Sequence, residues 1–175
     1  MNSRLLKRFY AVAVLALAGV LILPFGRGAV AHSADADEGK LQGTWHITVT
    51  LHNCQTGAPL VSFPSLLTFV RGGEFVEVTS NPAFLPGQRS PGVGTWSRTE
   101  AHTFKAVSDA FLYFNSPTNP PGFQRGVQRI IQDIEVNGDQ FSAKASTQFF
   151  DTNGNLLTTG CATAVGQRFP DLDAD

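Results

Sequence analysis

Apolar and polar residues alternate along most of this chain. From Trp45 to Leu51 the odd-numbered residues are apolar, while the even-numbered residues, including His46, are polar. A period of two places one face of a β-strand in a core and the other in solvent. Between residues 41 and 169, no ten-residue stretch shows the 3.6-residue apolar period of an amphipathic helix. The pattern therefore predicts an all-β domain.

Turn residues divide this region into eight predicted strands that follow one another as a meander. Gly72-Gly73 predicts a two-residue hairpin turn, because glycine adopts the positive φ angles that a tight turn requires. This turn sets Phe69 opposite Val76. The predicted strands lie at about residues 45–52, 66–71, 74–79, 94–98, 103–114, 127–136, 141–149 and 156–169.

Two cysteines help to choose the arrangement of these strands. Eight meandering strands suit a closed up-and-down barrel, which leaves no free edge, or a two-sheet sandwich. In a closed barrel the first and last strands pair antiparallel, so the numbers of paired residues have a near-constant sum. That sum differs by only two between the pairs Trp45–Arg168 and Cys54–Cys161, so one register serves both. We predict an eight-stranded antiparallel barrel with a disulfide between Cys54 and Cys161.

The first 31 residues differ in character from the rest of the chain. Arg4, Lys7 and Arg8 precede an apolar run over residues 10–25, and Ala29-Val30-Ala31 follows it. A basic start, an apolar core and small residues at the cleavage positions are typical of a secretory signal peptide. The alternative is an uncleaved membrane anchor, but the run is shorter than the ~20 residues of a spanning helix. An exported, periplasmic or extracellular protein is expected, and its oxidising surroundings favour the disulfide over free thiols.

Removal of the predicted signal peptide, residues 1–31, changes the charge of the chain. Residues 32–42 then form a polar linker, residues 43–169 the barrel domain and residues 170–175 an acidic tail. Four of the 13 basic residues leave with the signal peptide, so nine basic residues face 14 acidic ones and the net charge is −5. This balance argues against a nucleic-acid partner and against attachment to an anionic membrane. No stable membrane span is expected after cleavage, and the sequence identifies no protein partner.

Gly43-Thr44-Trp45 opens the first predicted strand, and Arg168 closes the last. These two motifs resemble the lipocalin and wider calycin pattern, in which a G-x-W tryptophan lies at the closed end of the barrel. A late arginine packs across that tryptophan, so the resemblance implies a structural cation–π contact between Arg168 and Trp45. The recurrence of Gly-Thr-Trp at residues 94–96 is similar to avidin-like barrels, and we assign Trp96 a structural role as well.

The lengths of the predicted loops point to a candidate site. The connections after the first, third and fifth strands are long, at about residues 53–65, 80–92 and 115–125. Alternate connections of an antiparallel meander lie at the same end, so these loops gather at one mouth opposite Trp45. Gln128 and Gln132 share the expected inward face of the sixth strand, where an unpaired buried amide costs ~1–3 kcal/mol. The candidate ligand-binding residues are Phe63, Phe84, Leu85, Phe123, Gln128 and Gln132.

Three functions are compatible with such a barrel. The leading interpretation is a binding protein for a small, largely apolar molecule that enters between the long loops. The alternative is an enzyme of the allene-oxide-cyclase kind, an isomerase or cyclase that orients a reactive substrate, and a lumenal carboxylate beside Gln128 would favour it. The third is a cell-envelope protein-interaction module whose barrel is filled by side chains.

Motifs of catalysis and metal binding are weak in this sequence. His46 and His52 lie six residues apart on the outward face of one strand, too far apart to share a metal ion. Residues 151–155 carry Asp and Asn at spacings that resemble part of a calcium loop, but a hairpin turn explains them better. The sequence has no Ser-His-Asp arrangement, P-loop or Rossmann glycine motif. We expect no metal, no cofactor and binding rather than catalysis.

Overall fold

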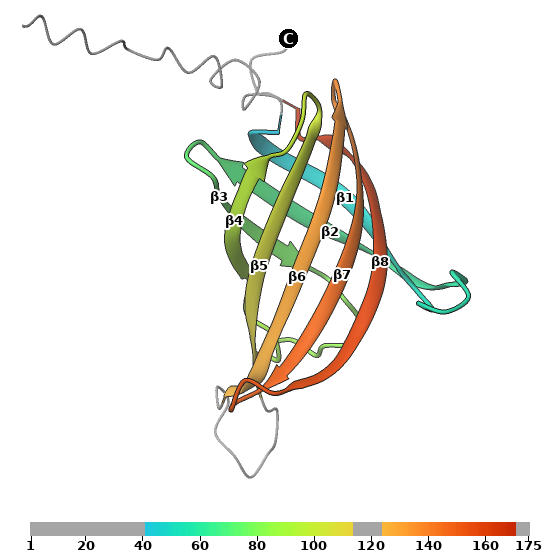
Figure 1. Ribbon diagram of the computed structural model, residues 1–175, viewed down its shortest axis with the longest axis vertical. Coiled ribbons are helices and arrows are strands. Elements are labelled where there is room, and N and C mark those ends of the chain that lie inside the picture. Colours follow the sequence, from blue (N-terminus) through green and yellow to red (C-terminus); the bar gives the residue numbers. More distant parts are fainter. Residues whose placement is uncertain (1–40, 114–123, 171–175) are drawn as a thin grey trace, which may run out of the picture. The chain divides into compact units, whose positions relative to one another are not determined.

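The computed structural model describes residues 41–113 and 124–170. These residues form one antiparallel sheet of eight strands, closed into a barrel in the order β1 to β8 (Figure 1). The predicted barrel is confirmed, and the two-sheet sandwich is excluded. Over the described ranges no helix is long and apolar enough to cross a membrane. The strands are β1 Gly43–His52, β2 Pro59–Val70, β3 Glu74–Thr79, β4 Gly92–Arg98, β5 Thr103–Tyr113, β6 Gln124–Asn137, β7 Gln140–Asp151 and β8 Leu156–Arg168.

Strands β1 and β8 close the barrel in the predicted register. Trp45 lies opposite Arg168, and His52 lies opposite Cys161. Just beyond His52, Cys54 forms a disulfide with Cys161, 107 residues further along the chain. This bond is consistent with an oxidising, exported compartment. The predicted signal peptide lies outside the described residues, as do most of the linker and of the acidic tail.

The hairpin between β2 and β3 differs from the prediction by one residue. Phe69 lies opposite Phe75 instead of Val76, because residues 71–73 form a three-residue loop in which Gly72 and Gly73 both have positive φ angles. A slip of one residue turns every side chain of a strand to the other face. Val76 is consequently exposed, whereas Phe75 and Glu77 are buried inside the barrel. An acidic residue is thereby brought into the interior.

Strand β2 starts earlier than predicted, at Pro59, so the first loop spans only residues 53–58. The sequence predicts one long loop over residues 53–65, and Pro59 and Pro64 within it donate no hydrogen bond to a sheet. The pairing of β2 with β3 begins only at Ser65. The preceding half of β2 therefore has an unpaired edge on that side, where proline is tolerated. Phe63 accordingly lies on a strand and not on a loop.

One end of the barrel is sealed around Trp45. The Arg168 guanidinium lies 4.3 Å from the centre of the Trp45 ring, and the Trp45 Nε1–H donates a hydrogen bond of 2.8 Å to the carbonyl of Leu41. A Cβ atom on Gly43 would lie 2.9 Å from Arg168 Nη1, and the φ angle of Gly43 is 116°. Only glycine accommodates both the backbone conformation and the close guanidinium. These contacts give a physical reason for the glycine of the G-x-W motif.

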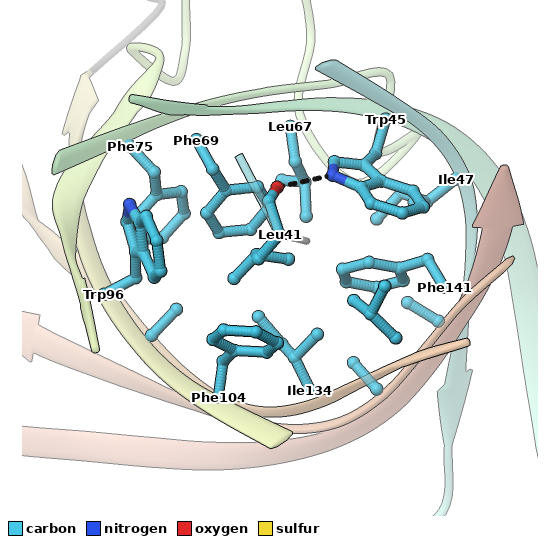
Figure 2. Packing of buried hydrophobic residues seen from close by; sticks show 14 residues of the cluster. Leu41, Trp45, Ile47, Leu67, Phe69, Phe75, Trp96, Phe104, Ile134 and Phe141 are labelled. Atoms are coloured by element: carbon cyan, nitrogen blue, oxygen red, sulfur yellow. Dashed lines mark hydrogen bonds between the residues drawn. The ribbon is translucent and has the colours of Figure 1, made fainter. Parts of the chain in front are cut away.

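Large side chains fill the interior next to this seal. The Leu41 side chain lies among aromatic rings contributed by several strands (Figure 2). Phe69 stacks on Phe75 with ring centres 5.1 Å apart, and Trp96 meets Phe104 at 5.8 Å. Burial of each such ring stabilises the fold by ~1.5–3 kcal/mol. The aromatic residues of this cluster are Trp45, Phe69, Phe75, Trp96, Phe104 and Phe141.

Inward-facing side chains become smaller toward the other end of the barrel. On β7 the inward positions change from Phe141 to Ala143 and Ala145, and on β8 the alanines Ala162 and Ala164 lie beside them. The connections β1–β2, β3–β4 and β7–β8 lie at this second end, since each joins an odd-numbered strand to the next even-numbered one (Figure 1). The barrel is therefore filled at its Trp45 end and less filled near these loops.

Candidate functional site

The loop-bearing half of the barrel encloses a cavity of about 50 Å³. One water molecule needs ~10–15 Å³ by this measure, so the cavity holds roughly three to five waters or one end of a ligand. Its apolar wall consists of Ile47, Val49, Leu51, Phe63, Leu67, Ile130, Ala145, Ala162 and Ala164. The polar residues of its lining are Ser65, Glu77, Thr79, Asn81, Gln128, Gln132, Thr147 and Thr163.

A wider pocket of about 560 Å³ opens above this cavity, and we call it the mouth pocket. It is bordered by residues 51–55, by parts of β2, β6, β7 and β8, and by the start of the β3–β4 loop. Its lining shares Leu51, Asn81, Gln128 and Thr147 with the cavity, so the two spaces adjoin. A volume of this size is within the usual range of small-molecule sites, ~300–1,000 Å³.

The residues predicted to bind a ligand separate into three groups. Phe63 and Gln132 line the cavity, Phe84 lines the mouth pocket, and Gln128 borders both. Leu85 instead lines a neighbouring groove of about 400 Å³, between β3 and the β3–β4 loop. Phe123 lies outside the described residues. The two amide side chains are the most enclosed of this set, since Gln128 and Gln132 are each 4 % exposed.

A buried ion pair that the sequence did not predict stands beside Gln128. Arg89 Nη2 donates a hydrogen bond of 2.8 Å to Glu77 Oε2, and the two side chains are only 5 % and 8 % exposed. Arg89 Nε donates a second hydrogen bond, of 2.5 Å, to Gln128 Oε1. A third, from Nη1 to the carbonyl of Ser90, measures 3.2 Å. One guanidinium therefore joins β3, β6 and the β3–β4 loop.

The β3–β4 loop directs Arg89 into the barrel by extending the sheet. Arg89 forms an isolated bridge with Leu112, and the backbone N–H groups of Ser90 and Tyr113 donate to Phe111 and Gln88. Leu112 is buried, and directly opposed residues of an antiparallel pair point to the same face. Arg89 therefore points inward although it belongs to a loop. No local pattern marks this, because the facing depends on a pairing with β5.

Several polar groups that face the cavity have no partner in the described part of the chain. Gln128 Oε1 accepts the hydrogen bond from Arg89, so its Nε2 donors remain for other partners. No hydrogen bond among the described residues reaches the Gln132 amide or Glu77 Oε1, and Thr79 Oγ1 is buried without a partner. Thr79 Oγ1, which is fully buried, costs ~1–3 kcal/mol unless a ligand satisfies it, and the other groups are open to water or a ligand in the cavity. The cavity therefore offers hydrogen bonds within a mostly apolar wall.

Comparisons with known proteins add little to this geometry. No family model matches the chain, and no curated protein matches its sequence. Among solved structures, the crystal structure of Rv2717c from M. tuberculosis is similar, with a TM-score of 0.35 and 18 % sequence identity. The match covers 79 % of this chain and 98 % of that chain. A likeness at this level carries no functional argument.

Proposed function

We propose that this protein is an exported, calycin-like barrel that binds a small, largely apolar molecule. The observation that carries the proposal is the mouth pocket of about 560 Å³ adjoining a cavity with a mainly apolar wall. The ligand enters between the loops and places one end in the cavity, next to Gln128 and Gln132. Phe84 and Leu60 contact its outer part, since both line the mouth pocket.

The size of the site sets the expected affinity. A ligand that loses on the order of 300 Å² of apolar surface to the pocket gains ~7 kcal/mol at ~25 cal/mol per Å². Loss of translational and rotational freedom offsets part of this gain. Because a dissociation constant of 1 μM corresponds to about −8.2 kcal/mol, micromolar or weaker binding is expected for a simple apolar probe.

Two measurements test the proposal. Mass spectrometry of organic extracts from natively purified protein should reveal a co-purifying small molecule, and the emptied protein should bind a fluorescent hydrophobic dye. The variant Ala145→Leu adds a large side chain to the cavity wall and should weaken dye binding at least about tenfold. Ser146→Leu is the matched control, because Ser146 is the next residue of β7 and points outward. The absence of both dye binding and a co-purifying molecule would refute the proposal.

A second candidate function is favoured by one observation. Glu77 places a buried carboxylate in the interior, and Arg89 links it to Gln128. This is the arrangement expected for a barrel enzyme of the allene-oxide-cyclase kind, in which polar groups position a reactive substrate. Turnover of a co-purified molecule that Glu77→Gln abolishes without loss of binding would favour the enzyme. The hollow half of the barrel counts against the third interpretation, a filled protein-interaction module.

A further inference from the structure

We infer that the end of the ligand buried in the cavity is electrically neutral and both donates and accepts hydrogen bonds, as a hydroxyl or a primary amide does. The inference rests on the proposed function and specifies the class of ligand. Carboxylates and ammonium ions of the same chain length are expected to bind with lower affinity than the neutral compounds.

The polar wall of the cavity presents an acceptor and a donor side by side. Glu77 Oε2 and Gln128 Oε1 bind adjacent nitrogens of the Arg89 guanidinium, so the two side chains lie within the width of one planar fork. The oxygen Glu77 Oε1 is left as an acceptor, and the amide nitrogen Gln128 Nε2 is left as a donor. A ligand hydroxyl or amide satisfies both, and Gln132 adds a donor and an acceptor on the same strand as Gln128.

The position of the charges disfavours ions. Among the described residues that line the cavity, Glu77 is the only ionisable one. The Arg89 guanidinium forms an ion pair with its carboxylate. Arg89 lines the groove beneath the β3–β4 loop and is not among the described residues that line the cavity, so its charge lies further from the ligand than that of Glu77. A ligand carboxylate would therefore meet the Glu77 carboxylate before any cation. A ligand ammonium would meet a carboxylate that already has its counter-ion, and it would lose its hydration.

The size of the discrimination follows from Coulomb's law. Two carboxylates about 4 Å apart, at an effective dielectric constant of about 20, repel each other by an amount equal to about a thousandfold in affinity. The attraction of Arg89 for the ligand offsets part of this repulsion. We therefore expect a preference of at least about tenfold for the neutral compounds.

The test is a competition series on the purified protein with its disulfide intact. The assay measures how well decanol, decanamide, decanoate and decylammonium each displace a bound hydrophobic dye at neutral pH. Decanol and decanamide are expected to compete at least about tenfold better than the two ions. If decanoate or decylammonium competes as well as decanol, the inference is wrong and the proposed function stands. If the dye binds and none of the four compounds displaces it, the inference is wrong and the proposed function stands. If the dye does not bind and no molecule co-purifies, the inference and the proposed function fail together.

Two variants connect the preference to the ion pair. Glu77→Gln leaves the Arg89 charge uncompensated, so the ratio of decanoate to decanol affinity should rise at least about tenfold. The double variant Glu77→Gln with Arg89→Met removes both charges and should keep the preference for decanol. The wild-type series decides the question by itself if Glu77→Gln fails to fold. An unchanged ratio in a folded Glu77→Gln protein would contradict the assigned role of Glu77.

Discussion

Replacement of Arg89 by methionine tests whether its guanidinium holds the Glu77 carboxylate inside the barrel. Both side chains are almost fully buried, so water screens their attraction little. Removal of one partner from a buried ion pair costs ~3–5 kcal/mol, because the remaining charge is left uncompensated. Gln128 Oε1 also loses its donor, which adds ~1–3 kcal/mol, and the packing of the methionine offsets part of the total. We expect Arg89→Met to lower the free energy of unfolding by ~3–5 kcal/mol.

Urea unfolding followed by tryptophan fluorescence measures this loss, because Trp45 and Trp96 are both buried. With an m-value of ~1–3 kcal/mol/M, the midpoint of the transition should fall by at least about 1 M. The double variant Glu77→Gln with Arg89→Met is the control, since it removes the unpaired charge and should recover at least ~2 kcal/mol. A loss below about 1 kcal/mol for Arg89→Met, or a double variant no more stable than the single one, would refute the reasoning.

Two further predictions concern the cavity and a turn. Gln132→Leu should raise the free energy of unfolding by up to ~1 kcal/mol, because it replaces an amide that lines a mostly apolar cavity and makes no hydrogen bond among the described residues, and it should weaken decanol binding in the same dye-displacement assay. Hydrogen bonds from the side chain and backbone of Asn155 lower the pKa of Asp151 below 3.8, so its carboxylate stabilises the native state above that pH and less so as pH falls through the lowered pKa. The difference in Tm between wild type and Asp151→Asn should therefore be constant above roughly pH 5 and shrink below pH 3.8.

The sequence predicted the barrel because its constraints are either local or covalent. Strict alternation defined β1, and one register joined the Trp45–Arg168 pair to the disulfide. The first half of β2 was missed because it contains prolines, which are tolerated there only at an unpaired edge. That edge is unpaired because the pairing with β3 begins only at Ser65, which the sequence of β2 alone does not show. The correct predictions used an alternation within one strand or a pair of cysteines that form a covalent bond, whereas the missed half of β2 depended on how far a neighbouring strand extends.

The ion pair was missed for two related reasons. Two consecutive glycines permit a two-residue or a three-residue turn, and the choice between them decides whether Glu77 or its neighbours face inward. Arg89 belongs to a loop whose facing is set by its bridge to Leu112. Gln128 and Gln132 were recognised as candidates because they share the face of β6 that carries apolar residues. The partner that orients Gln128 required the tertiary structure.

The interior of this barrel is not arranged for stability alone. At ~24 cal/mol per Å³, an empty volume of about 50 Å³ costs ~1 kcal/mol, and each unpartnered polar group adds to that. The aromatic cluster around Leu41 shows that the same fold accommodates a filled interior at its other end. Small residues such as Ala145 and Ala162 leave the second half hollow, and Glu77 with Gln132 makes it polar. A ligand with an apolar body and a neutral, hydrogen-bonding end would fill the space and satisfy these groups, so the features that weaken the empty barrel are the ones that would favour binding.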